Sequence, residues 1–238
     1  MEYRNSDKPF FLDHQTQVSA DVEASFISKV FLWMFVGLLI TGFTAFSVSN
    51  NPAWMEAIHF SSLRWLVMLA PIGLVILMGT RVHKMSAVAT TVTFFVFSTL
   101  MGLSLSYIFM IYTAASITNT FFISAATFGV MAAYGYVTKR DLTKMGSLLY
   151  MALVGLIITS VVNWFIGSSM IYWISSGFGV LIFVGLTAYD TQRIKQMAHE
   201  ASQDEEMMQK GAILGALSMY LNFVNLFLYL LRFFGGRD

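Results

Sequence analysis

The chain has 238 residues, of which 57% are hydrophobic and 11% are charged, whereas a soluble globular domain has about 45–50% apolar and about 25% charged residues. This composition excludes an ordinary soluble enzyme and indicates a polytopic membrane protein. The 14 Lys and Arg nearly balance the 13 Asp and Glu, and no dense basic cluster indicates a nucleic-acid partner. The absence of cysteine excludes disulfides and thiolate metal sites.

Seven apolar runs, each bounded by charged or turn residues, predict membrane-spanning helices, because a span needs roughly 20 apolar residues. In chain order they are 27–48, 63–79, 86–112, 120–137, 147–166, 171–190 and 212–234. The second run is short and contains Pro71, but proline is tolerated where neighbouring helices satisfy the freed backbone groups. The hydrophilic stretch 191–211 is expected to be a solvated, partly helical loop. The fold class is therefore predicted to be all-α, with seven transmembrane helices.

The basic residues predict the orientation of these helices. With the N-terminus inside, 11 of the 14 Lys and Arg fall on the inner side, as the positive-inside rule requires. Four of the five tryptophans fall near the predicted outer boundary, where an interfacial aromatic belt would lie. They are Trp54, Trp65, Trp164 and Trp173. We predict a cytoplasmic N-terminal tail, residues 1–24, a membrane domain, residues 25–235, and a C-terminus outside.

Asp190 is unusual among the acidic residues because it follows directly from an apolar run, 177–189. An ionisable side chain at membrane depth is costly and faces the protein interior or a water-filled cavity, so Asp190 is a candidate functional residue. The alternative is that Asp190 ends the sixth helix at the level of the lipid headgroups. Thr187 and Arg193 share its helical face, where they would supply a hydrogen bond and a counter-charge.

The last apolar run carries a single narrow line of small and polar residues, the polar seam, at spacings of 4, 3, 4, 3 and 4. Its members are Gly211, Gly215, Ser218, Asn222, Asn225 and Tyr229. The other faces of this run are apolar, so the polar seam is predicted to face other helices. Such a seam commonly serves helix packing alone. The alternative is that Asn222 and Asn225 supply neutral oxygen ligands to a hard cation beside a carboxylate.

Arg81 lies at the inner end of the second run, at the depth predicted for Asp190. If the two helices are neighbours, Arg81 would pair with Asp190 and close the inner mouth, and protonation of the carboxylate would weaken that pair. The alternative role for Arg81 is an anchor at the inner membrane surface. The chain has no HExxH, GxSxG or phosphate-loop motif, so neither catalytic residues nor a resident cofactor are expected.

Three segments carry a family resemblance. Residues 128–165 read FGVMAAYGYVTKRDLTKMGSLLYMALVGLIITSVVNWF, residues 179–192 read GVLIFVGLTAYDTQ, and residues 215–232 read GALSMYLNFVNLFLYLLR. These segments resemble the bacterial branch of the Bax inhibitor-1 family, the transmembrane Bax-inhibitor-motif proteins. The opening stretch FISKVFLWMFVGLLITGFTAF is also similar, so the resemblance covers nearly all of residues 25–235.

The resemblance implies six helices around a central seventh and a pH-sensitive calcium leak. In the calcium-leak members, two carboxylates on the last two helices share a proton and bind or gate the ion, with a second-helix Arg as a latch. Asp190 matches the first carboxylate and Arg81 the latch, but Asn222 stands where those members have the second Asp. We therefore expect weaker calcium binding and less pH sensitivity here. Asp141 of the family motif is expected to belong to a structural charge cluster.

The leading hypothesis is a passive calcium-permeable leak channel of the bacterial inner membrane. In this hypothesis Asp190 contacts calcium and responds to pH, Asn222 and Asn225 add oxygen ligands, and Thr187 and Ser218 support them. Membrane lipid and the calcium ion would be its partners. The alternative hypothesis is a non-enzymatic modulator of a membrane-bound ATP-dependent protease, contacted through the acidic N-terminal tail.

Overall fold

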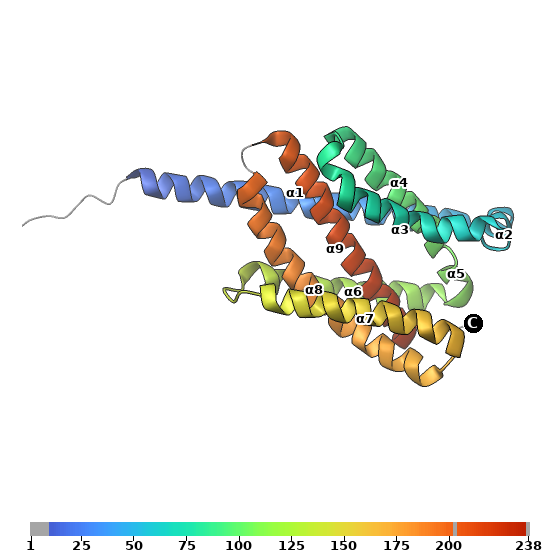
Figure 1. Cartoon of the computed structure of the whole chain (residues 1–238). Coiled ribbons are helices and arrows are strands. Elements are labelled where there is room, and N and C mark those ends of the chain that lie inside the picture. The colour runs from blue at the N-terminus through green and yellow to red at the C-terminus, as the bar shows by residue number, and fades with distance from the viewer. Residues whose placement is uncertain (1–9, 202–203, 237–238) are drawn as a thin grey trace, which may run out of the picture.

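The computed structural model describes residues 10–201 and 204–236, and side chains for 21–198 and 204–236. This described part is helical and contains no β-strand (Figure 1). In chain order its elements are α1 Phe10–Ser49, α2 Pro52–His59, α3 Leu63–Arg81, the 3₁₀ turn η1 Val82–Lys84, α4 Ala87–Leu105, α5 Ile108–Ile111, α6 Ala114–Val137, α7 Thr143–Ile166, α8 Ser169–Ala201 and α9 Glu205–Phe234. Seven segments are long and apolar enough to cross a membrane. The predicted all-α fold with seven transmembrane helices is confirmed.

Several predicted boundaries differ from the structure. Helix α8 continues to Ala201 instead of ending at Asp190, and α9 already begins at Glu205. Within the stretch 191–211, residues 191–201 and 205–211 are therefore helical, which is more helix than the partly helical loop expected there, and Asp190 lies inside α8. Helix α1 begins at Phe10, so the predicted tail is in part continuous with the first span, whereas residues 1–9 lie outside the described residues.

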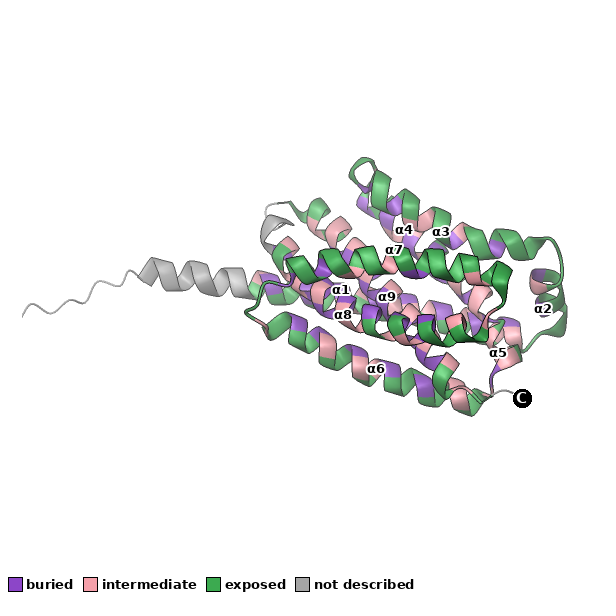
Figure 2. Cartoon of the chain, turned by 60° about the horizontal axis from the view of Figure 1, so that its bottom comes forward, coloured by how far each residue is buried: buried purple, intermediate pink, exposed green. Residues whose placement is uncertain are grey.

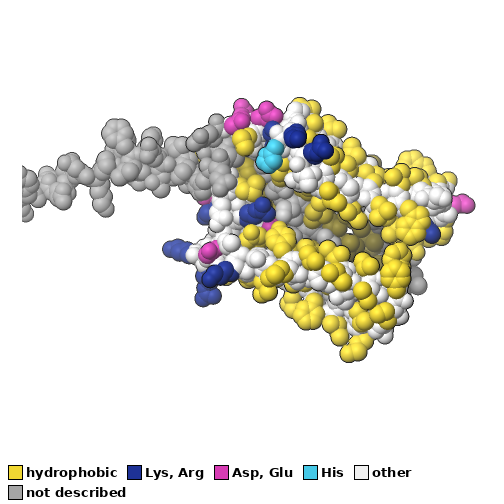
Figure 3. Space-filling view, in the orientation of Figure 1, with side chains coloured by type: hydrophobic (Ala, Val, Ile, Leu, Met, Phe, Trp, Pro, Cys, Tyr) yellow, Lys and Arg dark blue, Asp and Glu magenta, His cyan; other side chains and the backbone are white. Residues whose placement is uncertain are grey.

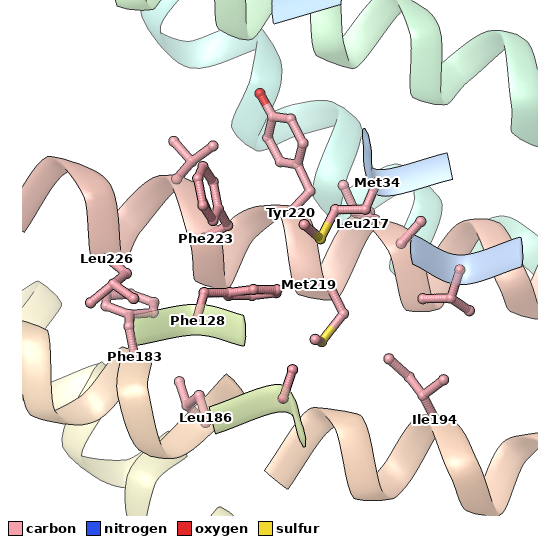
Figure 4. Close-up of a cluster of buried hydrophobic side chains, with 14 of the residues drawn as sticks. Met34, Phe128, Phe183, Leu186, Ile194, Leu217, Met219, Tyr220, Phe223 and Leu226 are labelled. Atoms are coloured by element: carbon pink, nitrogen blue, oxygen red, sulfur yellow. The ribbon is translucent and has the colours of Figure 1, made fainter. Parts of the chain in front are cut away.

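Helix α9 is the centre of the bundle. In its most apolar window 67% of the residues are buried, against 11% to 39% in the other six spans. It packs against α8, α1, α6 and α4, and Figure 4 shows its side chains meeting those of the surrounding helices. The central position of the last helix, which the resemblance implied, is therefore observed.

A buried polar contact fastens α9 to α1 and α4. The hydroxyls of Thr41 and Tyr220 lie 2.7 Å apart, and the Thr41 hydroxyl donates to the Ser98 carbonyl at 2.8 Å. The Phe97 ring packs against the Tyr220 ring with centroids 5.2 Å apart. Because a buried hydroxyl needs a partner, this contact favours one register of α9 against its neighbours.

The outer helices carry many exposed residues (Figure 2), and large hydrophobic side chains are numerous among them, as on a lipid-facing surface. Lys and Arg side chains gather at the end that carries η1 and the α6–α7 turn (Figure 3). The opposite end carries α2, where Trp65 and Trp164 pack with ring centroids 6.4 Å apart and Trp173 packs against Phe233 at 5.4 Å. We call these the basic end and the tryptophan end.

Candidate functional site

Asp190 is held inside the bundle by three hydrogen-bond donors. Its Oδ1 accepts a hydrogen bond from the Tyr150 hydroxyl at 3.1 Å. Its Oδ2 accepts hydrogen bonds from the Ser218 hydroxyl at 2.6 Å and from Asn222 Nδ2 at 2.7 Å. Asp190 is 2% exposed. Helices α7, α8 and α9 therefore meet at one carboxylate, and we call Asp190 with these donors the Asp190 cluster.

Two glycines set the position of Asp190 along α8. On α6, a Cβ at Gly135 would overlap the carbonyl of Ala188 and lie 2.9 Å from its Cα. On α7, a Cβ at Gly146 would overlap the ring of Tyr189. Small residues let helix backbones approach this closely in membrane proteins. The two residues that precede Asp190 are thus packed against neighbouring helices, which fixes the direction of the Asp190 side chain.

The next turn of α8 is fastened to the turn between α6 and α7. Gln192 accepts a hydrogen bond from the Leu142 amide at 2.9 Å and donates one to the Arg140 carbonyl at 2.8 Å. In that turn Asp141 accepts from the Thr143 amide at 2.9 Å, and the hydrogen bonds from Thr143 hold the pKa of the Asp141 carboxyl below its ordinary value. Asp141 is exposed and bonds to the first residue of α7, and it does not contact the Asp190 cluster.

A cavity of about 280 Å³ borders the Asp190 cluster, and we call it the Asp190 cavity. Asp190 and Ser218 line it, together with Val75 and Gly79 of α3 and with Arg193. In the space-filling view the surface is hollowed between α3 and α7 (Figure 3). The carboxylate therefore faces space between helices as well as its three donors.

Packed side chains fill the interface of α8 and α9 between Asp190 and the tryptophan end. The ring of Tyr229 lies against Gly179, where a Cβ would be 2.7 Å from the ring atoms, and it stacks on Phe183 with centroids 5.8 Å apart. The Arg232 guanidinium lies 4.6 Å from the centroid of the Tyr229 ring and 5.0 Å from that of Tyr172. We call this packing the Tyr229 plug. It fills the interface of α8 and α9 beyond the Asp190 cluster.

Two of the residues predicted for the site contact Asp190 and three do not. Ser218 and Asn222 are the two that do. The Thr187 hydroxyl donates to the Phe183 carbonyl at 2.7 Å, and Asn225 Nδ2 donates to the Leu221 carbonyl at 2.8 Å. Both side chains therefore bond to their own helices. Arg81 is exposed at the end of α3, and among the described side chains no ion pair joins it to Asp190.

Tyr150 is the contact that the sequence did not indicate. It lies in the fifth apolar run, on α7, and its ring packs edge-on against Tyr189 with centroids 6.0 Å apart. The available signal was that Tyr150 is the one tyrosine of that run, because a tyrosine hydroxyl within an apolar segment usually finds a hydrogen-bond partner. That signal does not say which helix holds the partner.

Comparison with known proteins places the whole membrane part in one group. A family model described as "Inhibitor of apoptosis-promoting Bax1" matches residues 23–238. Inner membrane protein YbhL of Escherichia coli K12 is 46% identical over 216 residues, which cover 90% of this chain and 92% of that protein. A Borreliella burgdorferi protein is 45% identical over 217 residues, covering 91% and 94%. Protein RP147 of Rickettsia prowazekii is 42% identical over 212 residues, covering 89% of both chains.

Proposed function

The chain belongs to the Bax inhibitor-1 family of membrane proteins, and on that premise we propose that it is a passive calcium-permeable leak whose ion path passes Asp190. The proposed location is the bacterial inner membrane, as the name of the Escherichia coli relative says of that protein. The basic end would face the cytoplasm, because Lys and Arg favour that side.

The observation that carries this proposal is a buried carboxylate that has neutral donors and, among the described side chains, no ion-pair partner, although Arg193 lines the same cavity. Among the described side chains, Asp190 accepts hydrogen bonds from two hydroxyls and one amide, and no ion pair reaches it. Neutral donors stabilise a carboxylate without cancelling its charge. A negative charge beside a cavity between helices attracts a cation, and ionisable residues in such places mark ion paths.

Calcium fits this site as a weakly held, passing ion. Calcium prefers six to eight oxygen ligands, and the Asp190 cluster offers the carboxylate, the Ser218 hydroxyl and, after rotation of the amide, Asn222 Oδ1. The described residues contain no group of three His, Cys, Asp or Glu that would hold a metal ion tightly. For Asn225 to join as a ligand, its hydrogen bond to Leu221 would have to break. Weak binding suits a leak, because a permeating ion must leave the site.

Calcium entry into liposomes tests the role of Asp190. We expect Asp190→Asn to reduce entry to the level of protein-free liposomes, because the change removes the charge and turns one acceptor into a donor that faces other donors. The matched control is Asp141→Asn, which removes the same charge from an exposed carboxylate outside the spans and should leave entry unchanged. Equal entry through the wild type and the Asp190 variant, with both melting at similar temperatures, would reject the proposal.

Modulation of a membrane-bound ATP-dependent protease is a second candidate function. The observation that favours it is the N-terminal part of α1, which projects beyond the other helices at the basic end (Figure 1). Removing residues 1–20 keeps the ion pair of Glu23 with Lys195 at 3.2 Å. We expect this truncation to abolish co-purification with the protease and to leave calcium entry intact. Retained co-purification would exclude the projecting segment as the contact.

A further inference from the structure

A second cavity connects the Asp190 cavity with the basic end. This mouth cavity, about 320 Å³, is lined by η1 residues including His83, by Met197 of α8, and by Lys210 and Leu214 of α9. Met197 and Leu214 also line the Asp190 cavity. The two cavities therefore adjoin, and together they extend from Asp190 to the turn between α3 and α4.

Lys210 crosses the edge of the mouth cavity. Its ammonium donates a hydrogen bond to the Met85 carbonyl at 3.1 Å and pairs with Glu206 at 3.1 Å. Met85 belongs to the α3–α4 turn, whereas Glu206 lies one turn before Lys210 on α9. The Lys210 side chain is 16% exposed and that of Glu206 is 54% exposed. A mostly buried ammonium thus holds the α3–α4 turn against the central helix.

Apart from Lys210, the α3–α4 turn and the end of α3 are held by the buried side chains of Val82 and Met78. Helix α3 packs mainly against α4 and α2, and across the Asp190 cavity it faces α8 and α9 without close packing. Adding a Cβ at Gly79 would meet no atom within 4 Å. A helix with few packed neighbours moves at low cost, and the hydrogen bond of Lys210 to Met85 links the turn directly to α9.

We infer that Lys210 is a positioning residue that keeps the inner mouth of the Asp190 cavity closed by fastening the α3–α4 turn to α9. The inference rests on the proposed function, for which this mouth is the inner end of the ion path. When the contact with Met85 breaks, the turn moves away from α9 and the mouth widens. The freed ammonium also leaves the mouth, so its positive charge no longer repels a cation that approaches there.

Thiol accessibility tests this role without requiring ion flux, because the chain has no cysteine. Val75→Cys places a thiol in the Asp190 cavity. The neighbouring Ile76→Cys places one at the same depth on the lipid-facing side of α3, where Ile76 is 60% exposed. Proteoliposomes receive a charged, membrane-impermeant methanethiosulfonate reagent on both sides, so the orientation of the protein need not be known. The rate of modification is the measurement.

We expect Lys210→Met to raise the rate of modification of Val75→Cys by about tenfold. The closed state loses one charge-assisted hydrogen bond, which increases the population of the open state by about that factor. Lys195→Met is the matched control. Lys195 also lies at the basic end and pairs with Glu23 at 3.2 Å, but it does not line either cavity. Lys195→Met should leave the rate of Val75→Cys modification unchanged. The thiol of Ile76→Cys should stay unmodified in every variant.

Glu206→Gln tests whether the hydrogen bond of Lys210 to Met85 or its ion pair with Glu206 holds the turn. It removes the ion pair but keeps the hydrogen bond of Lys210 to Met85, so we expect a rate within about twofold of the wild type. The inference is overturned if Lys210→Met does not speed modification, or if Lys195→Met speeds it equally. Calcium entry measured in the same liposomes keeps the two proposals apart. Faster modification without any calcium entry would reject the leak alone, and calcium entry with unchanged modification would reject the role of Lys210 alone.

Discussion

Gly135→Ala is expected to destabilise the protein by about 1–3 kcal/mol, the range found when an extra methyl group is forced into a packed interior. The added Cβ would overlap the Ala188 carbonyl and lie 2.9 Å from the Ala188 Cα. These are backbone atoms of a buried helix, so no flexible side chain can move aside, and α6 must separate from α8. The measurement is the melting temperature of the purified protein in detergent.

Gly129→Ala provides the control for this prediction. Gly129 lies on the same helix, and a Cβ there would meet no atom within 4 Å. The Gly129→Ala variant should melt at or slightly above the melting temperature of the wild type, because alanine has a higher helix propensity than glycine. If both variants melt alike, the close approach of α6 and α8 is not a source of stability. Because Ala188 lies two residues before Asp190, we also expect the Gly135 variant to lower calcium entry.

Asn222→Asp is expected to tighten calcium binding by at least about tenfold at about pH 8, and to lose this gain at about pH 6. The new carboxylate would take the position of an amide that now lies 2.7 Å from Asp190 Oδ2. Two carboxylates this close hold one proton between them because their like charges repel. Calcium replaces that proton at high pH, and the proton displaces calcium as the pH falls. Equilibrium binding of radioactive calcium to the purified protein measures the effect.

The matched control is Asn225→Asp, the same change on the same helix. Asn225 bonds to the Leu221 carbonyl and does not contact Asp190, so its carboxylate would have no partner with which to share a proton at this site. We expect little gain in affinity from it. A similar gain in calcium affinity in both variants would show that Asp190 and position 222 do not act as a pair. The same conclusion would follow if the gain in the Asn222 variant did not depend on pH.

The fold was predictable because hydropathy alone reports burial in lipid, whereas the ends of helices outside lipid carry no such signal. The apolar run of α8 stops at Asp190, but the helix continues to Ala201. Beyond the lipid it is held by contacts that a hydropathy profile does not contain. Gln192 bonds to the α6–α7 turn, and Lys195 bonds to Glu23 on α1. Both contacts join segments that are distant in sequence.

The Asp190 cluster was predictable where its members share a helical face and not where they depend on pairing between helices. Ser218 and Asn222 were identified from the 3 and 4 spacing of the polar seam, and both contact Asp190. Tyr150 was not identified, because the short connection that makes α7 and α8 neighbours does not say which of their side chains face each other. Thr187 was expected to bond to Asp190 but bonds to the backbone one turn earlier. Threonine in a helix commonly does so.

The Tyr229 plug makes the surroundings of Asp190 one-sided. Adjoining cavities lead from the carboxylate to the basic end, whereas Tyr229, Phe183 and Arg232 fill the interface of α8 and α9 toward the tryptophan end. In this conformation the two sides of the membrane are therefore not equivalent for Asp190, and a solute that enters through the adjoining cavities comes from the compartment at the basic end.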